Sequence, residues 1–261
     1  MLKPKLSGET ELSNFPKVEM KNLPSNFLPY PEGSKIHYRP YSFGEINEIS
    51  GSKISDEEQI KFVMKGIETT FDPYELTFGD YLHIALYRKL STLGGSKFTV
   101  QYRCDKCGNM GKFEFLIEKL DFDELQIPKL PVILTLSNGK ELHFTPITVN
   151  DYLTLLKKNL YRNKTAGLAV QVRNIGFDEA YDTIYKCIDL DDMRNLDEID
   201  KILYHSLRPI NVICQNSITH EDKSFSICGN KINVSIDGGG VVILPFRPDT
   251  IPERGGIRFG T

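Results

Sequence analysis

Two cysteine pairs, far apart in the sequence, constrain this chain more than any other feature. Cys104-Asp-Lys-Cys107 has the two-residue spacing that lets both sulfurs face one metal, and Gly108 follows where such a turn needs a positive φ. Cys214 and Cys228 are separated by thirteen residues, and a glycine again follows the second cysteine. We therefore predict a split four-cysteine zinc ribbon, whose Zn²⁺ is structural because four thiolates leave no open coordination position.

Other interpretations of these cysteines remain open. The pair Cys104–Cys107 also has redox spacing, but a redox pair normally opens a helix, and here strand-like sequence lies on both sides. Cys214 and Cys228 could be buried small apolar side chains. His220, in the loop between them, could replace a thiolate, whereas Cys187 fits the apolar stripe of a helix and is predicted to be core.

Hydroxyl-capped helix starts recur along the chain. Ser55-Asp-Glu-Glu58 is a capping box, and an apolar stripe of helical period follows it. A similar pattern begins at Ser42, Thr77 and Thr148. In each case an apolar residue follows the hydroxyl residue, and an acid lies three positions after the hydroxyl residue. This recurrence is either a weak internal repeat or the usual way to start a helix. Further helices are predicted over 149–161, 177–188 and 195–207.

Strand patterns surround the cysteines. Strands are predicted over 97–104, 112–116, 130–136, 140–145, 230–236 and 241–246. Asn138-Gly139 is a strong hairpin signal between two of them. The predicted fold is α+β, with helical layers, small antiparallel β-hairpins and the split zinc ribbon.

The chain divides into five predicted segments. Both ends are rich in proline or glycine, and residues 1–35 hold five of the fourteen prolines, which excludes a helix there. The N-terminal segment is also apolar, so we expect it to lie on its own body or on a neighbouring subunit rather than form a solvated tail. The segments are an extended N-terminal arm (1–35), an α+β body with the first zinc knuckle (36–146), a helical insertion (147–208), a second zinc knuckle with a β-hairpin (209–246) and an extended C-terminal arm (247–261).

Composition and motif searches narrow the function classes. The net charge of −3 argues against polyanion binding driven by bulk charge. No apolar run is long enough for a bilayer, and the N-terminus has no secretory signal, so we expect a soluble protein made and kept in the cytoplasm, with no membrane insertion. Nucleotide-binding, metalloprotease and hydrolase motifs are missing, and the acids of 189–200 resemble a solvated face. We expect neither an enzyme nor a small-molecule substrate.

Several short motifs follow one another in a distinctive order. Tyr38-Arg39-Pro40 precedes the Ser55 helix, and Phe71-Asp72-Pro73 precedes Leu76-Thr-Phe-Gly-Asp80. Leu86-Tyr-Arg88-Lys-Leu-Ser91 and Gly94 then lead into Tyr102-Arg-Cys104-Asp-Lys-Cys107-Gly108, and an apolar-acidic stretch follows. Over about residues 36–155 this order resembles the T4-type bacteriophage baseplate (tail hub) protein family, components of the tail hub of contractile-tailed phages.

The resemblance implies a structural protein of the virion, in or near the baseplate hub and wedges. Its partners would be other baseplate and tail proteins in a multi-subunit assembly, built in the host cytoplasm, and its arms could add strands to neighbouring sheets. Two alternatives stay open. One is an assembly chaperone that is absent from the virion. The other is a zinc-ribbon nucleic-acid-binding accessory protein, for which Arg103, Lys106, Lys112 and Lys231 would supply positive charge.

Overall fold

The computed structural model describes residues 16–49, 54–93, 97–116, 119–208, 210–219, 224–234, 252–253 and 256–257. Residues 1–15 of the predicted N-terminal arm, most of the C-terminal arm and the predicted strand 241–246 lie outside these ranges. The described residues form seven α-helices: α1 (Phe43–Ile49), α2 (Asp56–Met64), α3 (Phe78–Leu93), α4 (Val149–Lys157), α5 (Lys164–Ala169), α6 (Phe177–Tyr185) and α7 (Leu190–Leu203). A short 3₁₀ helix, η2 (Pro73–Glu75), precedes α3.

The strands are short, and all their pairings are antiparallel. The three-stranded sheet consists of β1 (Val18–Glu19), β2 (Ile36–Tyr38) and β3 (Ile67–Thr69). The two-stranded sheets pair β4 (Lys97–Arg103) with β5 (Met110–Leu116), β6 (Val132–Thr135) with β7 (Glu141–Phe144), β8 (Ile210–Ile213) with β11 (Lys231–Val234), β9 (Ser217–Thr219) with β10 (Phe225–Ile227), and β12 (Pro252–Glu253) with β13 (Gly256–Ile257). The α+β prediction is confirmed.

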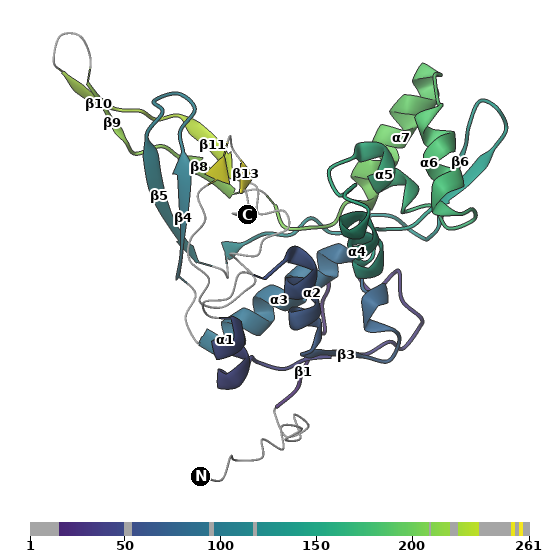
Figure 1. Cartoon of the computed structure of the whole chain (residues 1–261), viewed down its shortest axis with the longest axis horizontal. Coiled ribbons are helices and arrows are strands. Elements are labelled where there is room, and N and C mark those ends of the chain that lie inside the picture. Colours follow the sequence, from purple (N-terminus) through teal and green to yellow (C-terminus); the bar gives the residue numbers. More distant parts are fainter. Residues whose placement is uncertain are drawn as a thin grey trace, which may run out of the picture.

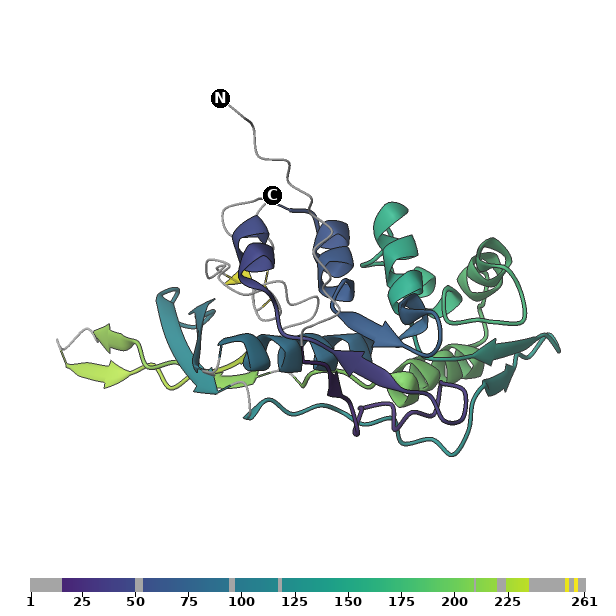
Figure 2. The same cartoon turned by 90° about the horizontal axis from the view of Figure 1, so that it is seen from below.

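The elements form three groups in a row. Figure 1 shows the hairpins β4–β5 and β8–β11 at one end, α1–α3 in the middle, and α4–α7 with β6 at the other end. In Figure 2, α3 lies lengthwise between the hairpins and the far helices. The apolar core follows this division, with one large cluster around α2, α3 and β2, a second around α6, α7 and β7, and a small third one inside the hairpins. The hairpins are therefore a satellite of the main core.

The N-terminal segment 16–35 packs on its own body. Its strand β1 pairs with β2, and Leu23 and Ser25 are buried. The carboxylate of Asp80 accepts hydrogen bonds from the backbone N–H of Ser25 at 3.0 Å, from the Ser25 hydroxyl and from the Tyr30 hydroxyl. Asp80 is the acid of the Thr77 helix start, so this acid holds the N-terminal segment instead of completing a capping box.

The predicted helix starts form as expected, but the helix ends differ from prediction. Ser55 and Thr148 both make full capping boxes. The helix predicted over 149–161 ends at Lys157, shortly before Asn159 turns to a φ of 55°. The helix predicted from 195 begins five residues earlier, because the Asp189 carboxylate accepts from the N–H groups of two following residues and caps α7.

Candidate metal centre

Two hairpins present the four cysteines in matching turns. In the first, the Cys104 carbonyl accepts from the N–H of Gly108 at 2.7 Å, and Gly108 has a φ of 71°. In the second, the Cys214 carbonyl accepts from the N–H of Gly229 at 3.0 Å, and Gly229 has a φ of 63°. Each turn uses a glycine in the left-handed region, where a Cβ would be strained. The repeated Cys-Gly of the sequence thus has one structural cause.

The four sulfurs come together at a single point. The Sγ atoms of Cys104 and Cys228 are 3.6 Å apart, and those of Cys107 and Cys214 are 3.8 Å apart. All four lie within 4.8 Å of one another, and three of the four cysteines are buried. A tetrahedral site with metal–sulfur bonds of about 2.3 Å has sulfur–sulfur edges of about 3.8 Å. The cluster therefore has the size and donor set to hold a thiophilic metal ion such as Zn²⁺.

The side-chain amides of two asparagines donate hydrogen bonds to cysteine sulfurs. The side-chain amide of Asn230 donates to the Cys104 sulfur at 3.6 Å, and that of Asn216 donates to the Cys107 sulfur at 3.7 Å. Hydrogen bonds of this kind orient metal ligands and stabilise thiolate charge. Neither asparagine was predicted from the sequence. For Asn230 a usable signal was present, because Cys-Gly-Asn occurs at 107–109 and again at 228–230, whereas Asn216 lies outside this motif.

The thiols differ strongly in their tendency to ionise. Burial works against ionisation of Cys104, but the N–H groups of Cys107 and Lys106 point at its sulfur and lower the pKa of that thiol to about 6. Burial raises the pKa of Cys214 to about 11. One thiolate thus forms readily and its neighbour resists, because a second negative charge would be buried beside the first. A divalent cation at the centre would remove that obstacle and favour four thiolates.

The aromatic ring of Tyr102 packs against the cysteine cluster. Tyr102 is buried among the cysteines, with Val212 and Ile232 of the facing hairpin. Its cross-strand partner is Gly111, and a Cβ on that glycine would lie 2.4 Å from a carbon of the tyrosine ring. The glycine therefore makes the space that the ring fills.

The remaining sequence candidates lie elsewhere. Cys187 is half-buried beside Asp192, with its sulfur 3.8 Å from a carboxylate oxygen, and burial raises the pKa of this thiol. It lies two residues beyond the end of α6 and is partly buried against the second apolar cluster, so it packs against the core but does not lie on the predicted helical stripe. His220 lies outside the described residues. Strands, not a helix N-terminus, lie on both sides of the Cys104–Cys107 pair, which does not favour a redox dithiol.

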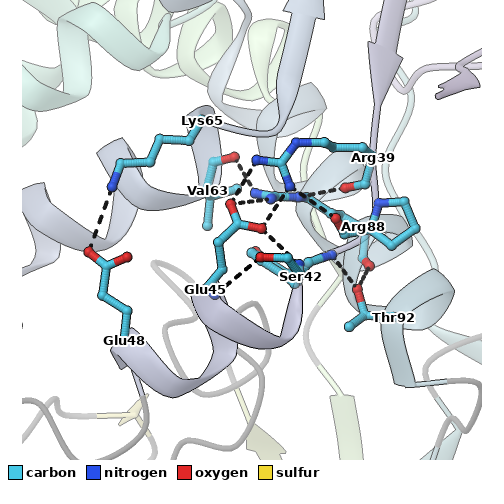
Figure 3. A network of polar contacts seen from close by, with 10 residues as sticks. Arg39, Ser42, Glu45, Glu48, Val63, Lys65, Arg88 and Thr92 are labelled. Carbon is cyan, nitrogen blue, oxygen red and sulfur yellow. Dashed lines mark hydrogen bonds and ion pairs between the residues drawn. The ribbon is translucent and has the colours of Figure 1, made fainter. Parts of the chain in front are cut away.

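A buried charge cluster explains several residues of the motif order (Figure 3). Arg88 is fully buried and donates to the carbonyls of Arg39 at 2.8 Å and Val63 at 2.7 Å, and to the Glu45 carboxylate at 3.3 Å. Arg39 forms a bidentate pair with the same carboxylate, at 2.7 and 2.8 Å. The Arg88 guanidinium also stacks on Tyr41, 3.8 Å from the ring centroid. These contacts join β2, α1, α2 and α3, so the motif residues have a structural role.

The fold and the cysteine cluster define an α+β protein with a zinc-ribbon-like site built from two distant hairpins. The family described as T4 bacteriophage base plate protein matches residues 16–238, which is most of the chain and extends well beyond the 36–155 of the sequence resemblance. The chain belongs to this family. Membership implies a phage baseplate protein that is located in the virion tail and contacts other tail proteins.

No curated protein and no solved structure matches the chain. Among its described residues, no helix combines the length and the apolar character that crossing a membrane requires.

Proposed function

We propose that this protein is a structural subunit of a contractile-tail phage baseplate, at the hub or the hub–wedge junction, whose two halves are stapled by Zn²⁺. Cys104 and Cys107 would ligate the ion from the first half, and Cys214 and Cys228 from the second. The observation that carries the proposal is the meeting of four sulfurs from distant hairpins at tetrahedral spacing. A closed four-thiolate site suits stability rather than catalysis.

Elemental mass spectrometry of the purified full chain tests the staple. We expect about one zinc per chain in the wild type, and little or none after Cys214→Ser. Cys187→Ser is the matched control, because Cys187 is a half-buried cysteine outside the cluster. Wild-type protein purified without chelator and found free of zinc would contradict the proposal, as would equal loss in both variants.

The terminal arms are proposed to dock on neighbouring subunits. Residues 16–35 lie on their own body, and in the C-terminal arm β12 pairs with β13 and contacts β4. The proposal therefore concerns residues 1–15 and the rest of residues 247–261. A segment that adds a strand to the sheet edge of a neighbouring subunit gains affinity through main-chain hydrogen bonds. Truncation of either segment should reduce incorporation into baseplates while leaving zinc content unchanged, and normal incorporation would contradict the docking role.

Two rival functions have separate tests. An assembly chaperone would act during tail construction in the host cytoplasm and be missing from purified virions, whereas a subunit would be present there at stoichiometric copy number. A nucleic-acid-binding role rests on four exposed, positively charged side chains around the ribbon: Arg103, Lys106, Lys112 and Lys231. It predicts binding that falls steeply with salt concentration, and the structural role predicts none.

A further inference from the structure

The helix-start motif belongs to a longer internal repeat. His37-Tyr-Arg-Pro-Tyr-Ser-Phe-Gly-Glu45 matches His143-Phe-Thr-Pro-Ile-Thr-Val-Asn-Asp151, with each residue 106 positions before its counterpart. Both stretches read histidine, aromatic, variable, proline, apolar, hydroxyl, apolar, turn-former and acid. Eight of these nine positions match in character, which exceeds what a helix cap alone requires.

The two stretches also fold alike. Each runs from a strand through a capped helix and a second helix to a returning strand, β2–α1–α2–β3 in the first copy and β7–α4–α5 with Val172 in the second. Tyr38 pairs with Ile67, and its counterpart Phe144 pairs with Val172. The following N–H groups, of Arg39 and Thr145, each donate across the strand pair at 3.0 Å.

An arginine holds the acid of each copy in the same way. Arg39 binds the Glu45 carboxylate in bidentate fashion and donates to the carbonyl of Pro40 at 3.2 Å. Arg173 binds the Asp151 carboxylate in bidentate fashion and donates to the carbonyl of the corresponding proline at 3.3 Å. The arginines come from different strands, so the structure repeats a constellation that the sequence alignment alone does not display.

The correspondence continues to the cysteines. Helix α3 leads into β4 and the first knuckle, and α7 leads into β8 and the second, and a strand follows Cys-Gly-Asn in both. We infer that the chain contains two copies of one unit, from β1 to β5 and from β6 to β11, with α6 in the place of η2 and with the hairpin β9–β10 added in the second copy. The helices of 147–208 are then the second unit's own, and each unit contributes one knuckle to the metal site.

Within the chain, the two units meet through two helix starts. The α3 start (Leu76–Phe78) of the first unit lies against the α4 start (147–149) of the second. Thr77 and Thr148 form a β-bridge, and the N–H of Phe78 and that of Val149 each donate across it at 2.8 Å. Leu76 and Val149 are fully buried there, and Phe78 stacks on the ring of an adjacent tyrosine with centroids 4.1 Å apart.

In the counterparts of these two helix starts, the apolar side chain at the first helical position is exposed, although Tyr41 of the α1 start is buried. The first unit's equivalent of the α4 start is the α1 start (41–43), where Phe43 takes the place of Val149 and is 78% exposed. The second unit's equivalent of the α3 start is the α7 start (188–190), where Ile188 and Leu190 are 89% and 69% exposed. Ile188 and Phe43 are the two most exposed large apolar side chains of the described residues.

We propose that the α1 start of one copy of this protein binds the α7 start of a second copy, by the contact that the α4 and α3 starts make inside the chain. Phe43 and Leu190 occupy the first helical position, where the helix offers their N–H groups no acceptor. Figures 1 and 2 both place α1 and α7 far apart, so the α1 start and the α7 start of one chain cannot contact each other. The contact is head-to-tail and leads to a ring or a filament.

This inference deepens the proposed structural role by naming one neighbour, and it rests on that role for its biological meaning but does not involve the metal. Sedimentation velocity of the full chain over a range of concentrations tests it. We expect the wild type to self-associate, and Phe43→Asp or Leu190→Asp to weaken association by roughly tenfold or more. An aspartate at the first helical position also favours the helix, so both variants should fold. Phe225→Asp, at a phenylalanine that is 75% exposed on β10, is the matched control and should associate like the wild type.

Mixing the two variants gives the sharpest result. The intact α1 start of Leu190→Asp can bind the intact α7 start of Phe43→Asp. The dimer cannot extend further, because the remaining surface of each partner carries the substitution. An equimolar mixture should therefore form dimers and stop there, with an affinity at least about tenfold higher than the self-association of either variant alone. A wild type that remains monomeric with a full complement of zinc would overturn the proposal and leave the zinc staple standing. Unchanged association in either variant, or no dimer in the mixture, would also overturn it.

Discussion

Glu45 offers a stability measurement whose size and pH dependence follow from its contacts. Burial opposes ionisation of this carboxyl, but the hydrogen bond from Arg39, the N–H of Ser42 and the charge of Arg88 together lower its pKa from 4.5 to about 2. At about 1.4 kcal/mol per pKa unit, the ionised group stabilises the fold by about 3 kcal/mol. Because the folded pKa is the lower one, this contribution is complete above pH 4.5 and is lost as the pH falls toward 2.

Glu45→Gln keeps the shape of the side chain and removes its charge. Urea unfolding followed by far-UV circular dichroism should show a loss of about 3 kcal/mol at pH 7 that shrinks to about 1 kcal/mol at pH 3. Any metal released by acid affects both proteins alike, so only their difference at each pH is compared. Glu57→Gln, at an acid that pairs with Lys61 on the surface, should change stability little at either pH. An equal difference between wild type and Glu45→Gln at both pH values would refute the reasoning.

Two further substitutions test the metal centre and the packing of α3. Asn230→Ala removes the amide that donates to the Cys104 sulfur and should lower the zinc affinity, measured by chelator competition, by about 10–100-fold. The control Asn211→Ala, at an exposed strand position, should leave the zinc affinity unchanged. Equal effects of the two substitutions would contradict the role of the amide. Gly79→Ala would place a Cβ 1.7 Å from the carbonyl oxygen of His205 and should lower the free energy of unfolding by several kcal/mol or prevent folding. Gly167→Ala on α5 meets open space and should raise the free energy of unfolding by up to about 1 kcal/mol, as measured by thermal unfolding. A Gly79→Ala variant as stable as the wild type would contradict the packing.

The parts of the structure that the sequence predicted are those with local signals. The Ser55 and Thr148 caps depend on residues three positions apart, so the hydroxyl and the acid can be read directly. The Cys104–Cys107 knuckle is equally local, and its match to Cys214 and Cys228 followed from the shared Cys-Gly. Even α7 had a readable cap in Asp189, but the charged stretch after it has too few apolar residues to mark the first turn of a helix.

The parts that were not predicted depend on partners distant in sequence. Nothing around Asp80 indicates that its carboxylate binds Ser25, 55 residues away, rather than its own helix start. The sequence around Arg88 likewise does not show that its guanidinium is buried and donates to two carbonyls and a carboxylate from other elements. A buried polar group needs all its partners in place at once, and no local pattern records them.

The position of the cysteines in a small cluster between the two hairpins gives the proposed zinc a specific task. Among the described residues, the apolar cluster inside the hairpins has six buried members, three of which are cysteines, whereas the two main clusters are larger and lie elsewhere. Two-stranded hairpins with so small a core are not stable in water by themselves. A metal that ties one knuckle from each repeat would supply the missing stability where the core cannot. Its removal should therefore loosen the ribbon and leave the body around Arg88 and Asp80 folded.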